Sequence, residues 1–263
     1  MAKAVEIPVY LFTGFLEGGK TRFIRETLED KKFNAGEHTL LVLCEEGEEE
    51  YDLSHPLMKN VHILPIESEE ELTAEKLGEW QKIHRVDRVV IEYNGMWPLQ
   101  RLYEQMPQGW MIYQEVMLAD YNTFLSYNTN MRSLMVDKLT SCEMVLLNRA
   151  PVGADKMEIH KVIRGVSRRT DIGYDYVDGS FDYDEIEDPL PFDINAPVIE
   201  IGDNDFAVWY RDLTEEMEKY QGKTVRFKGR VVTKHRSLKN CFVCGRHVMT
   251  CCVEDITFMG LAC

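Results

Sequence analysis

A run of eight residues near the start of the chain combines glycines, a lysine and a threonine at the spacing that binds phosphate groups. It reads Gly14-Phe15-Leu16-Glu17-Gly18-Gly19-Lys20-Thr21, which matches the pattern Gly-x-x-x-x-Gly-Lys-[Ser/Thr]. Gly14, Gly18 and Gly19 allow the backbone to turn tightly and to aim its N–H groups at phosphate oxygens. Lys20 is expected to reach the β and γ phosphates, and the Thr21 hydroxyl is expected to bind Mg²⁺.

Magnesium–phosphate sites of this kind also need a carboxylate at the end of a neighbouring strand, which organises the metal ion and its water. Glu92 ends the apolar segment 88–92 and is the first candidate. The alternative for Glu92 is a strand-end acid that faces solvent. Asp52 is a second candidate for a catalytic role. It belongs to the acidic stretch 45–52, for which a solvated loop and a direct metal-binding segment are the two interpretations.

A second group of candidate ligands lies at the carboxyl end of the chain, where five of the seven cysteines fall within residues 241–263. Cys241-x-x-Cys244 followed by glycine resembles a zinc knuckle, in which the turn aims two thiolates at one metal ion. In a reducing cytosol such a cluster favours metal binding, and the alternatives are apolar core cysteines and a redox role. The predicted metal ligands are Cys244, Cys251, Cys252 and Cys263, with His247 in reserve.

The elements that must position these groups alternate between apolar strands and helices through the first two thirds of the chain. Near-continuous apolar strands separated by helices indicate a parallel sheet covered on both faces, so we predict an α/β fold. Strands are expected at residues 7–12, 38–44, 61–66, 88–92, 110–118 and 144–147, and helices at 21–29, 69–84, 120–141 and 155–168. The glycine-rich run therefore follows a strand and begins a helix, which is the setting that its chemistry requires.

The composition of the chain changes after residue 178. Residues 178–197 hold seven acidic residues, three prolines and no lysine or arginine, which predicts an exposed linker over residues 179–197. An amphipathic helix is expected at 206–220, followed by alternating residues at 224–232 and further short strands. We therefore predict a nucleotide-binding domain at residues 1–178 and a small, mostly β domain, similar to an OB-type barrel, at residues 198–263.

The net charge of the chain is −15, which disfavours nucleic acids and anionic membranes as partners because both attract basic surfaces. The charge is uneven, since residues 198–263 carry ten basic and nine acidic residues, a net of +1, which leaves −16 for residues 1–197. This contrast supports two domains. The sequence shows no apolar run of about 18 residues and no amino-terminal leader pattern, so we expect a cytoplasmic protein without membrane insertion.

Four segments resemble, in order, the CobW-type GTPases, which are related to the nickel-insertion GTPases of hydrogenase and urease. They are TGFLEGGKT from residue 13, CEEGEEEYD from residue 44, IEYNGMWP from residue 91 and VLLNRA from residue 145, and the resemblance spans residues 5–178. It implies GTP and Mg²⁺ as ligands and hydrolysis as the activity. The residues that it implies at the nucleotide are Gly18, Gly19, Lys20 and Thr21 at the phosphates, Glu92 at Mg²⁺ and Asn148 at the guanine, with Glu17 and Arg22 beside them.

The chain departs from that family at two places that set its specificity. Asn148-Arg149-Ala150-Pro151 lacks the aspartate that would accept hydrogen bonds from guanine, and a carboxylate that reads a base edge supplies much of the discrimination between bases. Asp155 lies downstream as a candidate substitute, so GTP and ATP both stay open. The family's Gly-Cys-x-Cys-Cys metal motif has no counterpart, because no cysteine lies between residues 45 and 141.

The carboxyl-terminal segment resembles the small domain of YcgQ-type proteins, which are uncharacterised proteins found beside predicted permeases. The resemblance centres on Arg246, Met249, Thr250, Cys251, Cys252 and Asp255. It implies no established activity, and it indicates a permease or a metalloprotein client as the partner.

Two hypotheses of different classes follow. The first is a CobW-like, Mg²⁺-dependent GTPase (or ATPase) of metal homeostasis or of a metallocofactor or transport pathway, with zinc in the carboxyl-terminal domain. Its catalytic residues are predicted to be Lys20, Glu92 and Asp52, and a partner is expected to complete the site, since neither a catalytic glutamine nor an arginine finger is evident. The second is a degenerate phosphate-loop scaffold with a structural zinc site and little or no hydrolysis. No pattern in the sequence indicates the oligomeric state.

Overall fold

The computed structural model describes residues 6–45, 47, 49–233, 241–249 and 256–263. The chain divides into two compact units, one up to Asp184 and one from Glu185 onward, and each is described by itself. The first unit extends beyond the boundary expected at residue 178, because its last strand, Phe181–Tyr183, follows that residue.

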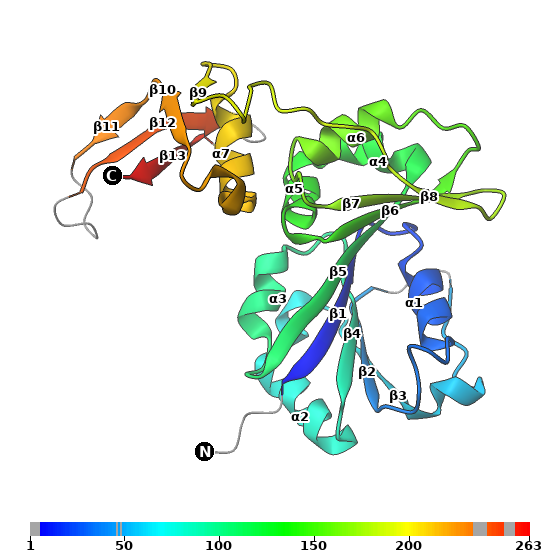
Figure 1. The fold of residues 1–263 in the computed structure, drawn as a ribbon. Coiled ribbons are helices and arrows are strands. Elements are labelled where there is room, and N and C mark those ends of the chain that lie inside the picture. The colour runs from blue at the N-terminus through cyan, green and yellow to red at the C-terminus, as the bar shows by residue number, and fades with distance from the viewer. Residues whose placement is uncertain (1–5, 46, 48, 234–240, 250–255) are drawn as a thin grey trace. The chain divides into compact units, whose positions relative to one another are not determined.

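The first unit is built on an eight-stranded sheet with the order β3-β2-β4-β1-β5-β6-β7-β8 (Figure 1). All neighbouring strands run parallel except the last pair. All five residues of β4 are buried, as a strand covered on both faces requires. The strands are β1 (Ile7–Thr13), β2 (Thr39–Leu43), β3 (Val61–Pro65), β4 (Arg88–Glu92), β5 (Trp110–Asp120), β6 (Met144–Ala150), β7 (Asp171–Tyr176) and β8 (Phe181–Tyr183).

Helices cover both faces of this sheet, which confirms the predicted α/β fold. On β1, Val9 and Leu11 belong to the apolar cluster beneath α2 and α3, whereas Phe12 belongs to the cluster beneath α1. This alternation follows from successive side chains of a strand pointing to opposite faces. The helices are α1 (Lys20–Leu28), α2 (Ala74–His84), α3 (Leu99–Gln105), α4 (Tyr121–Asn130), α5 (Arg132–Ser141) and α6 (Met157–Arg164), with short 3-10 turns η1 (Pro56–Asn60) and η2 (Glu69–Glu71).

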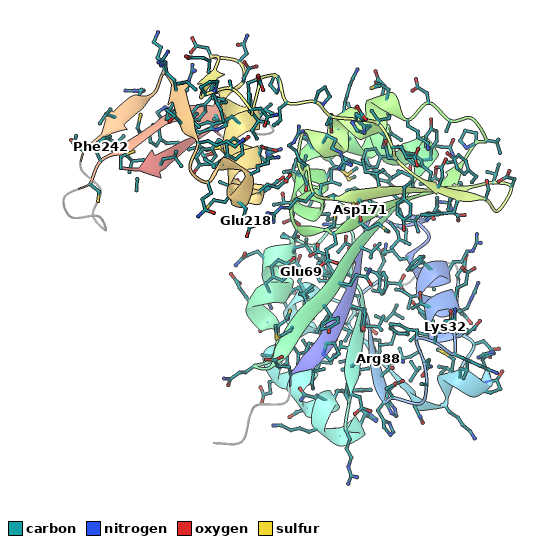
Figure 2. The ribbon with its side chains drawn as sticks, in the orientation of Figure 1. Lys32, Glu69, Arg88, Asp171, Glu218 and Phe242 are labelled. Atoms are coloured by element: carbon teal, nitrogen blue, oxygen red, sulfur yellow. The ribbon has the colours of Figure 1, made fainter. Side chains whose placement is uncertain are left out.

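Arg88, at the start of β4 (Figure 2), is a buried cation inside the sheet. Its Nε donates to the Thr39 hydroxyl at 2.8 Å, and its guanidinium lies 4.1 Å from the centre of the Phe33 ring. These contacts compensate the desolvation of the charge, since a buried cation without partners is costly. Arg88 therefore joins the start of β4 to β2 and to the loop after α1.

Two strands follow the helix predicted at 155–168, and they change the start of the expected linker. Phe181–Tyr183 pairs antiparallel with β7, and the hairpin closes with the Tyr176 N–H donating to the Ser180 carbonyl at 2.9 Å. Asp178 shapes the turn, because its carboxylate accepts from the Ser180 N–H and hydroxyl at 2.9 and 2.6 Å. Part of the acidic segment 179–197 is thus an edge strand with exposed side chains. The segment between the units begins after this strand.

The second unit is small and mostly β, as predicted. Its core contains Ile199, Ile201, Phe206, Trp209 and Tyr220. The described strands form a parallel pair, β10-β9, and an antiparallel sheet, β11-β12-β13, so closure into an OB-type barrel stays a prediction. The elements are β9 (Val198–Ile201), α7 (Phe206–Glu215), η3 (Met217–Tyr220), β10 (Thr224–Phe227), β11 (Arg230–Val232), β12 (Val243–Met249) and β13 (Ile256–Ala262). Among the residues that the structure describes, no helix is long and apolar enough to span a membrane.

Candidate functional site

The glycine-rich loop lies between the end of β1 and the start of α1, packed against the backbone of β5. Gly14 and Gly19 have φ angles of 122° and 87°, in the region that favours glycine. A Cβ atom on Gly14 would overlap the carbonyl group of Leu118, and one on Gly18 would lie 2.7 Å from the same oxygen. Close approach to β5 therefore requires glycine at both positions, and Glu17 adopts φ 61° to complete the turn.

Lys20 begins α1 and folds back under the loop, where its side chain is only 3% exposed. The ammonium group donates to the carbonyl oxygens of Gly14 and Phe15 at 2.8 and 2.9 Å. It also donates to Glu45 Oε2 at 2.5 Å, an ion pair with a carboxylate that is 11% exposed. The predicted phosphate-binding lysine is thus held at the centre of the loop.

Thr21 and Glu92 meet at the end of β4, next to β1 in the sheet. The Thr21 hydroxyl donates to Glu92 Oε1 at 2.7 Å, and the Tyr51 hydroxyl donates to Glu92 Oε2 at 2.5 Å. Glu92 is 2% exposed, so it does not face solvent. Burial raises the pKa of Glu92, and the hydrogen bonds from Tyr51 and Thr21 oppose that shift. A carboxylate and a hydroxyl oxygen are hard ligands of the type that Mg²⁺ prefers, so this pair fits the predicted metal site.

The opposite side of the loop is supported by the ends of β5 and β6, where Asp120 and Asn148 are register partners. The side-chain amide of Asn148 donates to the carbonyl of Gly18. Arg149 donates through Nε to Asp120 Oδ2 at 2.6 Å, and its guanidinium also donates to the carbonyl of Glu17. Asn148 and Arg149, both near the end of β6, therefore bind the backbone of the glycine-rich loop.

These groups enclose one pocket with a volume of about 620 Å³. Six predicted site residues line it, namely Glu17, Gly19, Lys20, Thr21, Arg22 and Glu92. Gly14, Gly18 and Asn148 are not among the lining residues and instead shape the loop from behind. The residues that line the pocket in addition are Leu16, Glu45, Gly47, Glu49, Asp120 and Arg149.

Asp52 and Asp155 lie away from this pocket. The Asp52 carboxylate is exposed and accepts from the Ser54 N–H and hydroxyl at 2.9 and 2.6 Å, which closes a local turn. Asp155 is exposed and accepts from the Met157 N–H at 3.0 Å, at the start of α6. Neither carboxylate is among the residues that line the pocket, so the catalytic role predicted for Asp52 has no contact to support it.

The structure adds Glu45, Tyr51, Asp120 and Arg149 to the site. Glu45 lies two residues after the end of β2, in the acidic stretch 45–52. Tyr51, the neighbour of the candidate Asp52, contacts Glu92 through its hydroxyl. Glu45 and Tyr51 both follow β2, which is the neighbour of β4 in the sheet. This position could have indicated their place at the site, because parallel strands bring their carboxyl ends to one edge of the sheet.

The predicted zinc ligands of the second unit are described only in part. Cys244 lies on β12 opposite Leu261, and Cys263 is exposed after β13. His247 lies three positions beyond Cys244 on the same strand, so the two side chains point to opposite faces and do not bind one ion together. Cys251 and Cys252 lie outside the described residues. Within the described residues, no group of three or more His, Cys, Asp or Glu side chains is arranged to hold a metal ion.

A parallel sheet whose first strand runs through a glycine loop into a helix that begins with lysine and threonine defines the P-loop class of α/β domains. The family model of the DUF1980 C-terminal domain matches residues 181–263, which are β8 and the second unit. A curated protein, the pre-mRNA-splicing factor SYF1 of Debaryomyces hansenii, is 30% identical over 95 residues. That match covers 34% of this chain and 11% of the yeast protein.

The solved structures that are similar to the chain include two from different organisms. The Zn(II)-bound YjiA GTPase from E. coli has 21% sequence identity and a TM-score of 0.47, over 64% of this chain and 57% of that one. The hydrogenase maturation factor HypB from Archaeoglobus fulgidus has 15% identity and a TM-score of 0.44, over 64% of this chain and 80% of that one. The chain thus spans little more than half of the length of YjiA.

Proposed function

We propose that the first unit binds a nucleoside triphosphate together with Mg²⁺ and hydrolyses it as a GTPase or ATPase. The observation that carries this proposal is the convergence of Lys20, Thr21 and Glu92 on one pocket, below a loop whose glycines pack against β5. These three residues supply a phosphate-binding cation and two metal-binding oxygens, from the start of α1 and the end of β4.

Each residue has a distinct role in the proposed reaction. Lys20 and the backbone N–H groups of the loop bind the β and γ phosphate oxygens, where negative charge grows during transfer. Thr21 and Glu92 would hold Mg²⁺, which when bound neutralises phosphate charge. Glu92 also orients a water molecule for attack. Arg22 and Glu17 also line the pocket. We expect slow hydrolysis in isolation, because positioning of the nucleophile is often completed by a partner protein.

The base is proposed to be read weakly. Position 151 is a proline, and Asp155 is not among the residues that line the pocket. The groups on that side are Arg149 and Asp120, which already bind one another at 2.6 Å. A paired carboxylate has less capacity to bind a guanine edge than the free aspartate of an Asn-Lys-x-Asp motif. Comparable affinities for GTP and ATP are therefore expected.

The wider role that we propose is in metal homeostasis, or in a metallocofactor or transport pathway, within the cytoplasm. It rests on the resemblance of residues 5–178 to CobW-type GTPases and on the carboxyl-terminal cysteines. Zinc bound by Cys244 and Cys263 together with Cys251 and Cys252, and a permease or metalloprotein client, belong to this proposal. Elemental analysis of protein purified without added metal tests the zinc: less than about a tenth of an equivalent contradicts a structural site.

A scaffold that binds nucleotide without hydrolysis is the second candidate, because the base-reading aspartate is replaced by Pro151. Isothermal titration with GTP and ATP, each with and without Mg²⁺, separates the outcomes when it is combined with a phosphate-release assay. The hydrolase proposal is supported if Lys20→Ala abolishes nucleotide binding and if wild type releases phosphate faster than nucleotide in buffer alone. Binding without release supports the scaffold, and no binding of either nucleotide overturns both.

A further inference from the structure

The ammonium group of Lys20 has no hydrogen left for a phosphate oxygen in the arrangement that the structure shows. An ammonium carries three donors, and these donate to Gly14 O, Phe15 O and Glu45 Oε2. The two carbonyls belong to a loop that is packed against β5. Glu45 is a side chain of the loop after β2, so it is the partner that an incoming anion can replace.

The charges around the pocket point in the same direction. Its lining residues include five carboxylates and three cations, a formal excess of two negative charges. Entry of a polyphosphate is therefore opposed until a carboxylate leaves Lys20. Removal of Glu45 by a neutral ligand would leave a buried ammonium without its counter-charge, which is strongly unfavourable. Exchange of one anion for another avoids that cost, so this lysine selects for anionic groups.

We propose that Glu45 is a built-in competitor of phosphate for Lys20, and that binding of a diphosphate or triphosphate group releases Glu45 from the loop. This proposal rests on the proposed function of the site, since it concerns the same lysine. Release also reaches the loop after β4, because Glu45 Oε1 accepts from the Gly95 N–H at 3.4 Å. Gly95 packs tightly on the phosphate loop, where an added Cβ would lie 2.7 Å from Gly14 O.

In this proposal, phosphate binding affects the start of the loop after β2 and leaves the contacts of its far end unchanged. Its far end is held by Tyr51 on Glu92 and by Glu49, which lies 3.2 Å from the Arg25 guanidinium. Those contacts do not involve Lys20, so phosphate alone leaves them in place. Binding of phosphate to Lys20 therefore changes the contacts of Glu45 and Gly95, and it does not require Thr21 or Glu92.

The test is isothermal titration with sodium pyrophosphate, without Mg²⁺, on the full chain. Glu45→Gln keeps the shape of the side chain and removes its charge, so it should bind pyrophosphate at least about fivefold more tightly than wild type, a typical coupling between competing sites. Glu71→Gln is the matched control, because Glu71 forms a 2.7 Å ion pair with Lys76 outside the pocket lining; it should bind as wild type does. The double variant Glu45→Gln/Lys20→Ala should lose binding.

The outcomes separate this proposal from the proposed function. If wild type binds pyrophosphate and Glu45→Gln binds it equally or more weakly, the proposed competition is overturned. The proposed nucleotide site is not affected by that result. Absence of binding of pyrophosphate, GTP and ATP to wild type and to Glu45→Gln alike overturns both proposals. Should Glu45→Gln fail to fold, hydrogen exchange on wild type decides: pyrophosphate should accelerate exchange of the Gly95 amide, and unchanged or slower exchange overturns the competition.

Discussion

The side-chain amide of Asn148 donates a hydrogen bond to the carbonyl of Gly18, a residue 130 positions earlier in the chain. The approach is so close that a Cβ on Gly19 would lie 2.5 Å from the Asn148 nitrogen. The end of β6 thus supports the phosphate loop directly. Asn148, expected from its motif to contact the base, has a structural task that does not depend on which base is bound.

Replacement of Asn148 by alanine should weaken GTP and ATP binding equally. The Gly18 carbonyl would lose its partner, and loss of a part-buried hydrogen bond costs about 1 kcal/mol. Isothermal titration with both nucleotides provides the measurement. Asn130→Ala, an exposed asparagine on α4, is the control and should change neither affinity. Selective loss of GTP binding would show instead that Asn148 reads guanine.

Gly18→Ala should abolish nucleotide binding, because its Cβ would lie 2.7 Å from Leu118 O and 3.0 Å from Phe15 O, so the loop must shift. Gly78 offers a matched control within α2, where an added Cβ meets no atom within 4 Å. Gly78→Ala should keep full binding and raise the free energy of unfolding by about 1 kcal/mol. Retention of wild-type affinity in Gly18→Ala, measured by titration, would show that contact with β5 does not shape the site.

Stability should decline in mildly acidic solution because of His62, which stacks between two other histidines. His38 Nδ1 lies 3.3 Å from His62 Nε2, and the His62 and His84 ring centres are 4.0 Å apart. Burial, with the nearby charges of His84 and His38, lowers the pKa of His62. At mildly acidic pH the unfolded chain therefore binds a proton at His62 more readily than the folded chain does. The free energy of unfolding falls as the pH drops through about 6.5, the pKa of a free histidine.

Thermal melts of wild type and His62→Gln between pH 5.5 and 7.5 measure this effect. The variant should show a shallower decline in Tm toward acid, because the group with the lowered pKa is gone. His55→Gln, which leaves the stack intact, should follow the wild-type slope. Parallel curves for wild type and His62→Gln would assign the acid sensitivity to other groups.

Alkylation with iodoacetamide at pH 8 should distinguish four of the described cysteines by their burial. Cys44 and Cys142 are buried, and burial raises the pKa of each thiol to about 12, so both should stay unmodified in the folded protein because the thiolate is the reactive form. Cys241 and Cys263 are exposed and should react in protein freed of metal. Peptide mass spectrometry reads each site.

The same experiment with a zinc chelator tests the proposed metal site. If zinc is bound by the carboxyl-terminal cysteines, Cys263 should react slowly at first and quickly once the chelator is added. Equal rates with and without chelator would argue against zinc at Cys263. Cys142 is the internal control, since a chelator should leave a buried structural thiol unchanged.

The glycine-rich loop, the parallel sheet and the presence of a small second unit could all be predicted from the sequence. Each depends on local patterns: the glycine spacing before Lys20, the continuous apolar strands, and the change of composition after residue 178. Glu92 was also within reach of sequence reasoning, because the end of an apolar strand is a defined position in a parallel sheet.

Which carboxylates take part in the site depends on how the strands pack together in the folded domain. Glu45 and Asp52 belong to one acidic stretch, yet Glu45 binds Lys20 whereas Asp52 closes an exposed turn. The distinction arises because β2 and β1 flank β4 and the loop after β2 reaches the phosphate loop from there. Likewise, Arg149 reaches Glu17 because β6 lies beside β5. The order of strands in a sheet is set by packing of the whole domain, and no short segment encodes it.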